Sequence, residues 1–344
     1  MFSYTLNPEW ISAFSRVFEL SKIRSEEKCV ILTEAGSRME NIQLARIAMT
    51  QLGLHHFVIE VPTPNFTPGP IERSTGASYC LTGHDTVVAA LCDCDVIVDL
   101  TVEGLMHAPQ TRKILQSGAR ILNISNEHPQ VLARLVPDES LKERVKIAAR
   151  QCRESKEMIV SSNAGSHLSV DISTAPSVGI WGFTDRPGTL SHWPGGIVVC
   201  FPQEKTVNGV LVFEPGDINL TFKRYFDSKV IFHIEEDYVT RIEGDNLDAR
   251  LMREYLHSFA EPEAWATSHV GWGLNAGARY EALAMYDKND INGTELRALA
   301  GNFLFSTGAN EFAKRYTRGH FDLPMMGCTI RLDNVCVVSD GKLC

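Results

Sequence analysis

The first half of the chain alternates short β-rich runs with longer amphipathic segments, and this alternation restricts the fold more than any other feature of the sequence. The β-rich runs occupy residues 28–34, 56–62, 95–101, 119–125 and 157–163. Helical segments are expected between them, at residues 39–53, 84–94, 108–118 and 128–155. Asn7 and Pro8 suit the cap and the first position of a helix, so a further helix is expected at the start. Repeated strand–helix–strand units predict a mostly parallel sheet with helices on both faces.

The second half has a different texture, because turn-punctuated β segments replace the alternation after about residue 165. The sequence Val207-Asn208-Gly209-Val210 lies between two apolar runs and predicts a hairpin turn. One helix is expected over residues 246–260. We therefore expect an α/β N-terminal domain with a mostly parallel sheet over residues 1–165, and an α+β C-terminal domain over residues 166–344.

Composition and charge argue against several classes of partner. The formal charge of −9 and the lack of a dense Lys/Arg run disfavour nucleic acid, because phosphate binding needs a basic stripe. No apolar run approaches the roughly 20 residues that span a bilayer, so no membrane partner is expected. The first ten residues lack a signal-peptide pattern, and the nine cysteines are typical of reduced thiols. We expect a cytoplasmic protein with a small-molecule or protein partner.

Two loops bear on cofactors and assembly. The segment ILTEAGSRMEN follows the first strand with one glycine where a dinucleotide site has three, and no GxxxxGK[ST] occurs, so no nucleotide cofactor is expected. Residues 61–76 contain four prolines and form a long loop for an α/β unit. This loop is expected to be a contact arm or part of a site rim. Together with exposed strand edges in the second domain, it predicts a homo-oligomer.

The C-terminal stretch GHFDLPMMGCTIRLDN places His320 and Asp322 one residue apart. On a strand, side chains at this spacing project from the same face. Imidazole and carboxylate form a mixed ligand set that iron, zinc or manganese accepts, although two ligands do not make a site, and a capped turn before Pro324 is the simpler alternative. His269, at the head of a glycine-rich segment, is the best third ligand, although alone it is more typical of a core histidine. The three residues together would form a two-histidine, one-carboxylate face on a ferrous ion.

Three segments carry a resemblance to a known family. TSHVGWGLN, GHFDLPMMGCTIRLDN and RPGTLSHWPGGIVVCFPQEKTVNGVLVFEPGD are similar to the C-terminal domain of the thermophilic leucyl-type metallo-aminopeptidases. They more closely resemble the ring-cleaving branch of that superfamily, the 2,5-dihydroxypyridine 5,6-dioxygenases of bacterial nicotinate catabolism. The resemblance covers nearly the whole chain, with its most specific motifs after residue 180. It implies an aminopeptidase-like, metal-binding C-terminal domain that carries catalysis.

The departures from the aminopeptidase pattern favour the dioxygenase branch. Where the aminopeptidases have approximately Pro-x-Gly-Glu, with a metal-binding glutamate, this chain has residues 194–197, Pro-Gly-Gly-Ile. His269 replaces the glutamate before the GxGxN turn, and Leu304 replaces the histidine of a His-x-x-x-Gly motif. A dinuclear hydrolase would have lost most of its ligands. The resemblance therefore implies one Fe(2+) held by His269, His320 and Asp322.

The resemblance also implies a reaction and further site residues. The expected reaction is cleavage of the 5,6 bond of a dihydroxylated pyridine with O2, giving N-formylmaleamate. A histidine that is neutral near pH 7 suits the base that takes the hydroxyl proton. The candidates are His107, in a strand-to-helix loop where α/β folds build sites, and His192, and for each the alternative is an ordinary cap or surface histidine. Ser306 is a candidate for a hydrogen bond to the substrate, while Glu103 and His167 are weaker candidates.

Two other functions stay open from the sequence. One is a metal-dependent aminopeptidase or amidohydrolase on the same scaffold, which Gly196 and His269 disfavour. The other is a non-catalytic binding homologue that keeps the fold. Because pocket shape sets specificity, a related dihydroxylated heterocycle also remains open as substrate. Zinc accepts the same ligand types as iron.

Overall fold

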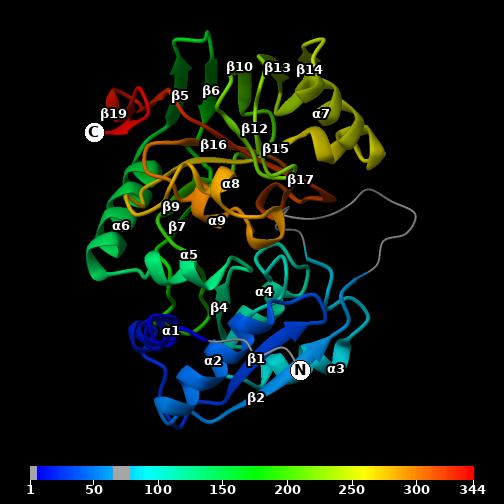
Figure 1. Ribbon diagram of the computed structural model, residues 1–344. Coiled ribbons are helices and arrows are strands. Elements are labelled where there is room, and N and C mark those ends of the chain that lie inside the picture. The colour runs from blue at the N-terminus through cyan, green and yellow to red at the C-terminus, as the bar shows by residue number, and fades with distance from the viewer. Residues whose placement is uncertain (1–5, 65–77) are drawn as a thin grey trace.

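Five parallel strands form the sheet of the N-terminal part in the computed structural model, which describes residues 6–64 and 78–344 (Figure 1). Their order across the sheet is β2 (His56–Val61), β1 (Cys29–Glu34), β3 (Val96–Asp99), β4 (Arg120–Ile124) and β8 (Leu190–Trp193). Every neighbouring pair is parallel. All residues of β1, β3 and β4 are buried, as expected for strands covered on both faces. The predicted α/β architecture is confirmed.

Helices cover both faces of this sheet, because its strands present apolar side chains on both sides. One face packs against α1 (Pro8–Leu20), α2 (Met39–Gln51) and α5 (Pro129–Arg134). The other packs against α3 (Asp85–Cys92) and α4 (Thr111–Gln116). The Asn7 side chain accepts the N–H of Glu9 and Pro8 starts α1, as predicted. Within the described part of the chain, no helix is long and apolar enough to cross a membrane.

The single helix expected over residues 128–155 is wrong, because this stretch forms two helices. α5 ends at Arg134, and α6 (Glu139–Glu154) begins after Asp138, whose side chain accepts the N–H of Leu141. Pro137 lies between them and cannot donate the hydrogen bond that a continuous helix needs.

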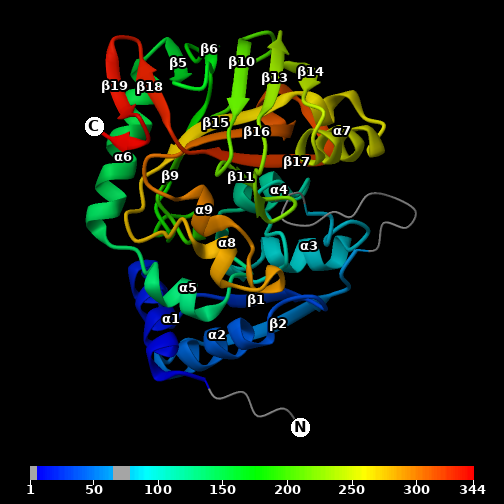
Figure 2. The ribbon, with the colours of Figure 1, turned by 45° about the horizontal axis from the view of Figure 1, so that its top comes forward.

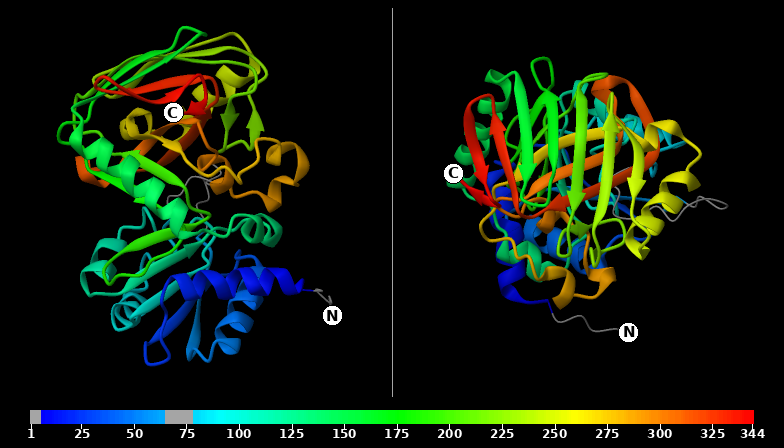
Figure 3. Two further views of the ribbon diagram at one scale, coloured as in Figure 1. Left: turned by 90° about the vertical axis from the view of Figure 1, so that its left-hand side faces the viewer. Right: turned by 90° about the horizontal axis from the view of Figure 1, so that it is seen from above.

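Two antiparallel sheets form the C-terminal part, layered face to face in Figure 3. The larger sheet has the order β14 (Tyr238–Glu243), β13 (Val230–Glu235), β10 (Val207–Phe213), β6 (His167–Asp171), β5 (Glu157–Ser162), β18 (Cys328–Leu332), β19 (Val335–Ser339) and β20 (Lys342–Leu343). The smaller has the order β17 (Arg315–Met325), β16 (Phe303–Asn310), β15 (Thr267–Gly273), β9 (Ile197–Cys200) and β7 (Ser177–Ile180). The largest apolar core of the described residues lies between these sheets.

Shorter elements connect the sheets and flank them (Figure 2). They are β11 (Ile218–Asn219), β12 (Arg224–Tyr225), α7 (Leu247–Ser258), α8 (Ala282–Met285), α9 (Thr294–Arg297) and the single-turn helices η1 (Pro262–Trp265), η2 (Lys288–Asp290) and η3 (Glu311–Ala313). The helix expected over residues 246–260 is confirmed as α7. Its N-terminus is capped by Asn246, whose side chain accepts the N–H of Ala249.

Alternation along β16 and β17 separates the core from the functional face. Phe321 and Leu323 point into the core between the two antiparallel sheets. His320 and Asp322 therefore project from the opposite face, toward the N-terminal part. The predicted strand around this pair is confirmed, so the capped-turn alternative is wrong.

Two strands near the expected domain boundary belong to a different sheet from the one that the boundary predicts. The segment 157–163 was expected in the parallel sheet and instead forms β5, antiparallel to β6 and β18. Its burial alternates, with Met158 and Val160 buried, as suits a sheet covered on one face. β8 lies after residue 165 yet completes the parallel sheet. The boundary at residue 165 stays a prediction.

The predicted hairpin turn at residues 207–210 is wrong. These residues lie inside β10, where Gly209 pairs with Leu168 on one side and Ile234 on the other. Gly209 has a φ of 138°, and a Cβ there would lie 2.1 Å from the carbonyl oxygen of His167. Glycine is therefore required for a close approach of two strands and not for a turn. The proline-rich loop of residues 61–76 lies largely outside the described residues, and self-association stays a prediction.

Candidate active site

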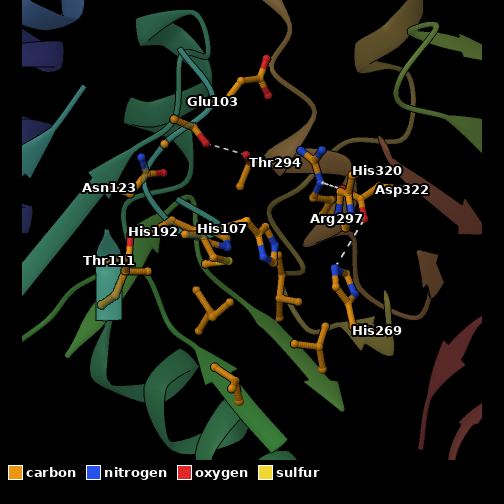
Figure 4. Close-up of a pocket in the computed structure, with 18 of the residues that line it drawn as sticks. Glu103, His107, Thr111, Asn123, His192, His269, Thr294, Arg297, His320 and Asp322 are labelled. Atoms are coloured by element: carbon orange, nitrogen blue, oxygen red, sulfur yellow. Dashed lines mark hydrogen bonds and ion pairs between the residues drawn. The ribbon is translucent and has the colours of Figure 1, made fainter. Parts of the chain in front are cut away.

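A cavity of about 310 Å³ lies between the parallel sheet and the five-stranded antiparallel sheet. Its N-terminal wall is built from the loops that follow β3 and β4, at the carboxyl ends of parallel strands, where open α/β sheets bind ligands. Its C-terminal wall is the outer face of β9, β15, β16 and β17. Figure 4 shows His107 at the centre of the view, with Asn123 and Thr111 on one side and His269, His320 and Asp322 on the other.

Strand register brings the C-terminal polar side chains together. Ser306 of β16 is paired with Asp322 of β17, and Gly308 is paired with His320. The pairing of β15 with β16 shifts between Thr267 and Val270, so His269 lies at a β-bulge. Bulges re-aim side chains and are common beside active sites. Four residues from three neighbouring strands therefore reach the same end of the cavity.

The carboxylate of Asp322 contacts all the other side chains of this group and also Arg297. Nε2 of His320 lies 3.4 Å from its Oδ1, and Nε2 of His269 lies 3.7 Å from the same oxygen. The hydroxyl of Ser306 donates a short hydrogen bond to Oδ1. Nε of Arg297 donates to Oδ2 at 2.6 Å. The side chains of His269, His320 and Arg297 are all nearly buried, so their interactions with Asp322 are weakly screened.

The protonation states of these groups are those of metal ligands. Burial opposes ionisation of Asp322, but Arg297 and the neighbouring histidines outweigh burial and hold the pKa of the carboxyl well below its usual range. Burial is the main reason that the pKa of His269 falls from 6.5 to about 3, although the charge of Asp322 acts in the opposite direction. At neutral pH the site therefore presents a carboxylate beside a neutral imidazole, the forms that bind metals.

These residues fit a single metal ion. The Nδ1 atoms of His269 and His320 are buried and have no hydrogen-bond partner among the described residues. A hydrogen bond at Nδ1 therefore does not explain why the two rings lie where they do. Their Nε2 atoms instead converge on one carboxylate oxygen. Two histidines and one carboxylate on a face with open positions are the ligand set of non-haem ferrous oxygenases.

A second ligand set exists at the same place. Ring nitrogens of His107, His269 and His320 all lie within 4.8 Å of one another. The ring of His107 lies 5.2 Å from that of His320, centroid to centroid. Its Nδ1, however, lies 3.2 Å from Oε1 of Glu311. Nδ1 of His107 is thus engaged by a carboxylate, whereas Nδ1 of His269 and Nδ1 of His320 have no hydrogen-bond partner among the described residues.

The two candidate bases share one arrangement, in which a protein oxygen holds Nδ1. Nδ1 of His192 lies 2.8 Å from the carbonyl oxygen of Pro194 and therefore donates to it. Burial lowers the pKa of His192 from 6.5 to about 4, so this ring is neutral. Burial also lowers the pKa of His107, but the charge of Glu311 and the hydrogen bond to it raise the pKa above its ordinary value overall. In the neutral form of either ring, a proton on Nδ1 leaves the lone pair on Nε2.

A buried glutamate of the N-terminal part positions the segment that carries Arg297. The carboxylate of Glu127 accepts the backbone N–H groups of Asn292, Gly293 and Glu295. The side chain of Glu295 in turn pairs with Arg134 at 2.6 Å. These contacts fix the start of α9 against the N-terminal part.

Three comparisons with known proteins agree with this geometry. Residues 9–344 match the family model NicX, described as 2,5-dihydroxypyridine 5,6-dioxygenase. The chain is 35% identical over 343 residues to the 2,5-dihydroxypyridine 5,6-dioxygenase of Pseudomonas putida strain KT2440, covering 98% of this chain and 96% of that protein. The chain belongs to the 2,5-dihydroxypyridine 5,6-dioxygenase family.

Two solved structures have a fold similar to that of this chain. The 2,5-dihydroxypyridine dioxygenase from Pseudomonas putida KT2440 superposes with a TM-score of 0.92 at 33% identity, covering 97% of this chain and 96% of that one. Wild-type AmpT from Thermus thermophilus superposes with a TM-score of 0.66 at 12% identity, covering 98% and 100%. The second similarity concerns the fold alone. The expected family and the aminopeptidase-like fold class are confirmed.

The structure of this dioxygenase-family chain gathers most of the residues singled out from the sequence. The cavity is lined by Glu103, His107, His192, His269, His320 and Asp322. Ser306 is fully buried behind them and hydrogen-bonds Asp322. His167 does not lie there, because it is exposed on β6 in the eight-stranded sheet. The roles of these residues as ligands and bases stay predictions.

Two cavity residues had no signal in the sequence of this family member. Arg297 stands in TELRALAGN and Glu311 in ANEFAK, and neither stretch carries a motif. Arg297 reaches Asp322 from a segment that contacts with Glu127 of the N-terminal part hold in place. Glu311 reaches His107 across 204 residues of sequence.

The neutral, buried state of His192 predicts a loss of stability in acid. An unfolded chain takes up a proton at this ring near its ordinary pKa, whereas the folded protein does so only near the lowered value of about 4. Between these values the unfolded state binds more protons, so the free energy of unfolding falls as the pH falls through the window. The contribution of His192 is about 3 kcal/mol.

Denaturant unfolding of metal-free protein above and below this window measures the effect. We expect wild-type protein to lose about 3 kcal/mol more than a His192→Gln variant, whose amide does not titrate. If the free energy of unfolding changed equally with pH in the two proteins, the His192 ring would already be protonated in the folded state, and the prediction would be wrong.

Proposed function

We propose that this protein is a non-haem iron(II) dioxygenase of the extradiol type, which cleaves the 5,6 bond of 2,5-dihydroxypyridine with O2 to give N-formylmaleamate. Membership of the family supports the substrate and the ring-cleaving activity. The observation that carries the iron assignment is the convergence of two imidazole Nε2 atoms on one oxygen of Asp322, at the wall of a cavity large enough for a substituted ring.

His269, His320 and Asp322 are the residues proposed to hold the iron. When bound, ferrous iron with open positions lets electrons pass from an electron-rich ring to dioxygen and so avoids the spin barrier to their direct reaction. Arg297 holds Asp322 in its ionised form, as the lowered pKa of the carboxyl indicates. Ser306 fixes the orientation of the same carboxylate through its hydroxyl.

The remaining side chains would bind the ring and move its proton. His107 and His192 each face the cavity with Nδ1 engaged, so Nε2 is the atom that accepts the proton of a substrate hydroxyl. An apolar wall that includes Ile197, Val199 and Leu304 excludes water from one side of the ring.

The same positions disfavour a hydrolase. Ile197 lines the cavity where the aminopeptidase pattern has its metal-binding glutamate, and an isoleucine binds no metal. Leu304 lines the cavity where the aminopeptidase pattern has a histidine, and a leucine binds no metal. The second metal of a dinuclear hydrolase therefore has no ligands at these two positions.

Oxygen uptake tests the proposed function. Protein is loaded anaerobically with iron(II), mixed with 2,5-dihydroxypyridine, and followed by an oxygen electrode and mass spectrometry. We expect one O2 consumed for each ring opened, and a product heavier than the substrate by two oxygen atoms. Zinc-loaded protein given a peptide substrate is the matched control. Peptide hydrolysis without oxygen uptake would favour the hydrolase, and neither activity would favour a binding protein.

A further inference from the structure

The connection between β16 and β17 brings a carboxylate to the base candidate of the other sheet. Glu311 is the first residue of η3, directly after the strand that carries Ser306 and before the strand that carries His320 and Asp322. Its Oε1 lies 3.2 Å from Nδ1 of His107, which belongs to the loop after β3. This contact crosses from one wall of the cavity to the other.

The turn that presents Glu311 is anchored on both sides. The side chain of Asn310, which is fully buried, accepts the N–H of Ala313 and donates to the carbonyl oxygen of Pro202. Lys314 closes the turn with a φ of 56°. The backbone of Glu311 is therefore fixed by contacts that do not involve His107. These contacts place the carboxylate at the cavity independently of its interaction with His107.

The contact has a consequence for the chemistry of the ring. The side chain of His107 is 6% exposed and that of Glu311 is 34% exposed, so one end of the pair is buried and the other meets solvent. A carboxylate oxygen can only accept, so Nδ1 of the neutral ring must carry the proton. A free histidine side chain prefers the proton on Nε2, the atom that must be unprotonated to act as a base toward the cavity.

We propose that Glu311 is a positioning residue, which orients the His107 ring and fixes its neutral form with the proton on Nδ1. This inference rests on the proposed function, because it assigns His107 as the acceptor of the substrate proton. Glu311 itself does not take part in bond making. The partners of catalytic and metal-binding histidines commonly act in this way, and their loss typically costs about 10- to 100-fold in activity.

Two substitutions separate orientation from charge. Glu311→Gln keeps an oxygen that accepts from Nδ1 but loses the charge, whereas Glu311→Ala loses both. We expect Glu311→Ala to lower kcat about 10- to 100-fold with unchanged iron content, and Glu311→Gln to restore most of the loss. Glu243→Gln is the matched control, because Glu243 makes a comparable contact of 2.8 Å with His233 on the outer sheet. It should leave kcat unchanged.

A double substitution tests whether Glu311 acts through His107. In a His107→Ala background, the further change Glu311→Ala should have little additional effect on kcat. An equal loss in both backgrounds would overturn the proposal. A rise in KM with unchanged kcat would also overturn it, since Glu311 would then be a direct substrate contact.

The tautomer of His107 provides a readout that needs neither iron nor activity. In metal-free protein with isotopically labelled histidine, nitrogen shifts distinguish protonated from unprotonated ring atoms, and His107→Ala identifies the signals. At a pH where the ring is neutral, we expect the proton on Nδ1 in wild type and Glu311→Gln, and largely on Nε2 in Glu311→Ala. The same tautomer in all three proteins would overturn the proposal. If wild-type protein shows no oxygen uptake, the proposed function fails while this result still stands.

Discussion

A His320→Ala variant will neither retain iron nor open the ring. Its imidazole is 2% exposed and lies 3.4 Å from the carboxylate oxygen on which His269 also converges, so its loss removes one of three proposed ligands. Two ligands do not hold a ferrous ion against solvent and chelators. Metal content measured after gel filtration should fall from about one iron per chain to near zero. Oxygen uptake with 2,5-dihydroxypyridine should fall to background.

His107→Ala is the matched control for that variant. Both side chains are buried at the same cavity, and a ring nitrogen of each lies within 4.8 Å of the other. If His269, His320 and Asp322 hold the iron, His107→Ala keeps its iron and loses turnover about 10²- to 10⁴-fold, as expected for removal of a base. If His107→Ala loses its iron while Asp322→Asn keeps it, the three-histidine set is the correct one. Far-UV circular dichroism confirms that each variant is folded.

Local patterns in the sequence were sufficient to predict how the pair on β17 projects and where the loop of His107 lies. His320 and Asp322 share a face because a strand has a period of two, and this period does not depend on the partner strands. His107 could be placed because a loop after a parallel strand opens at the carboxyl edge of the sheet. His269 was singled out by its place at the head of a glycine-rich segment and supported by the family resemblance, but no local pattern indicates that it lies at a bulge.

Features that depend on distant pairing could not be predicted in this way. Asn208-Gly209 has the composition of a turn, yet the close approach of β6 to β10 requires glycine at position 209. β5 reads as one more strand of the alternating half, but its half-buried pattern suits only the antiparallel sheet. Arg297 and Glu311 become site residues through contacts made across the cavity. Each is an ordinary charged residue until the two parts of the chain meet.

Arg297 is expected to couple the stability of the protein to metal binding, because it pairs with the proposed ligand Asp322. Its Nε donates to Asp322 at 2.6 Å, and both side chains are nearly buried. Breaking a buried ion pair by removing one partner typically costs about 3–5 kcal/mol, because the remaining charge is left without compensation. In metal-free protein, Arg297→Met leaves Asp322 in that state. With iron bound, the metal supplies positive charge to the same carboxylate.

We therefore expect Arg297→Met to be strongly destabilised without metal, by about 3–5 kcal/mol, and much less destabilised with iron bound. Thermal or denaturant unfolding of both forms under anaerobic conditions measures the difference. Arg315→Met is the matched control, because Arg315 forms a similarly buried pair with Asp237 at 3.2 Å, outside the residues that line the cavity. Its loss should be the same with and without iron. Equal losses for Arg297→Met in the two forms would show that Asp322 is not a ligand, since a metal-bound carboxylate cannot be indifferent to the metal.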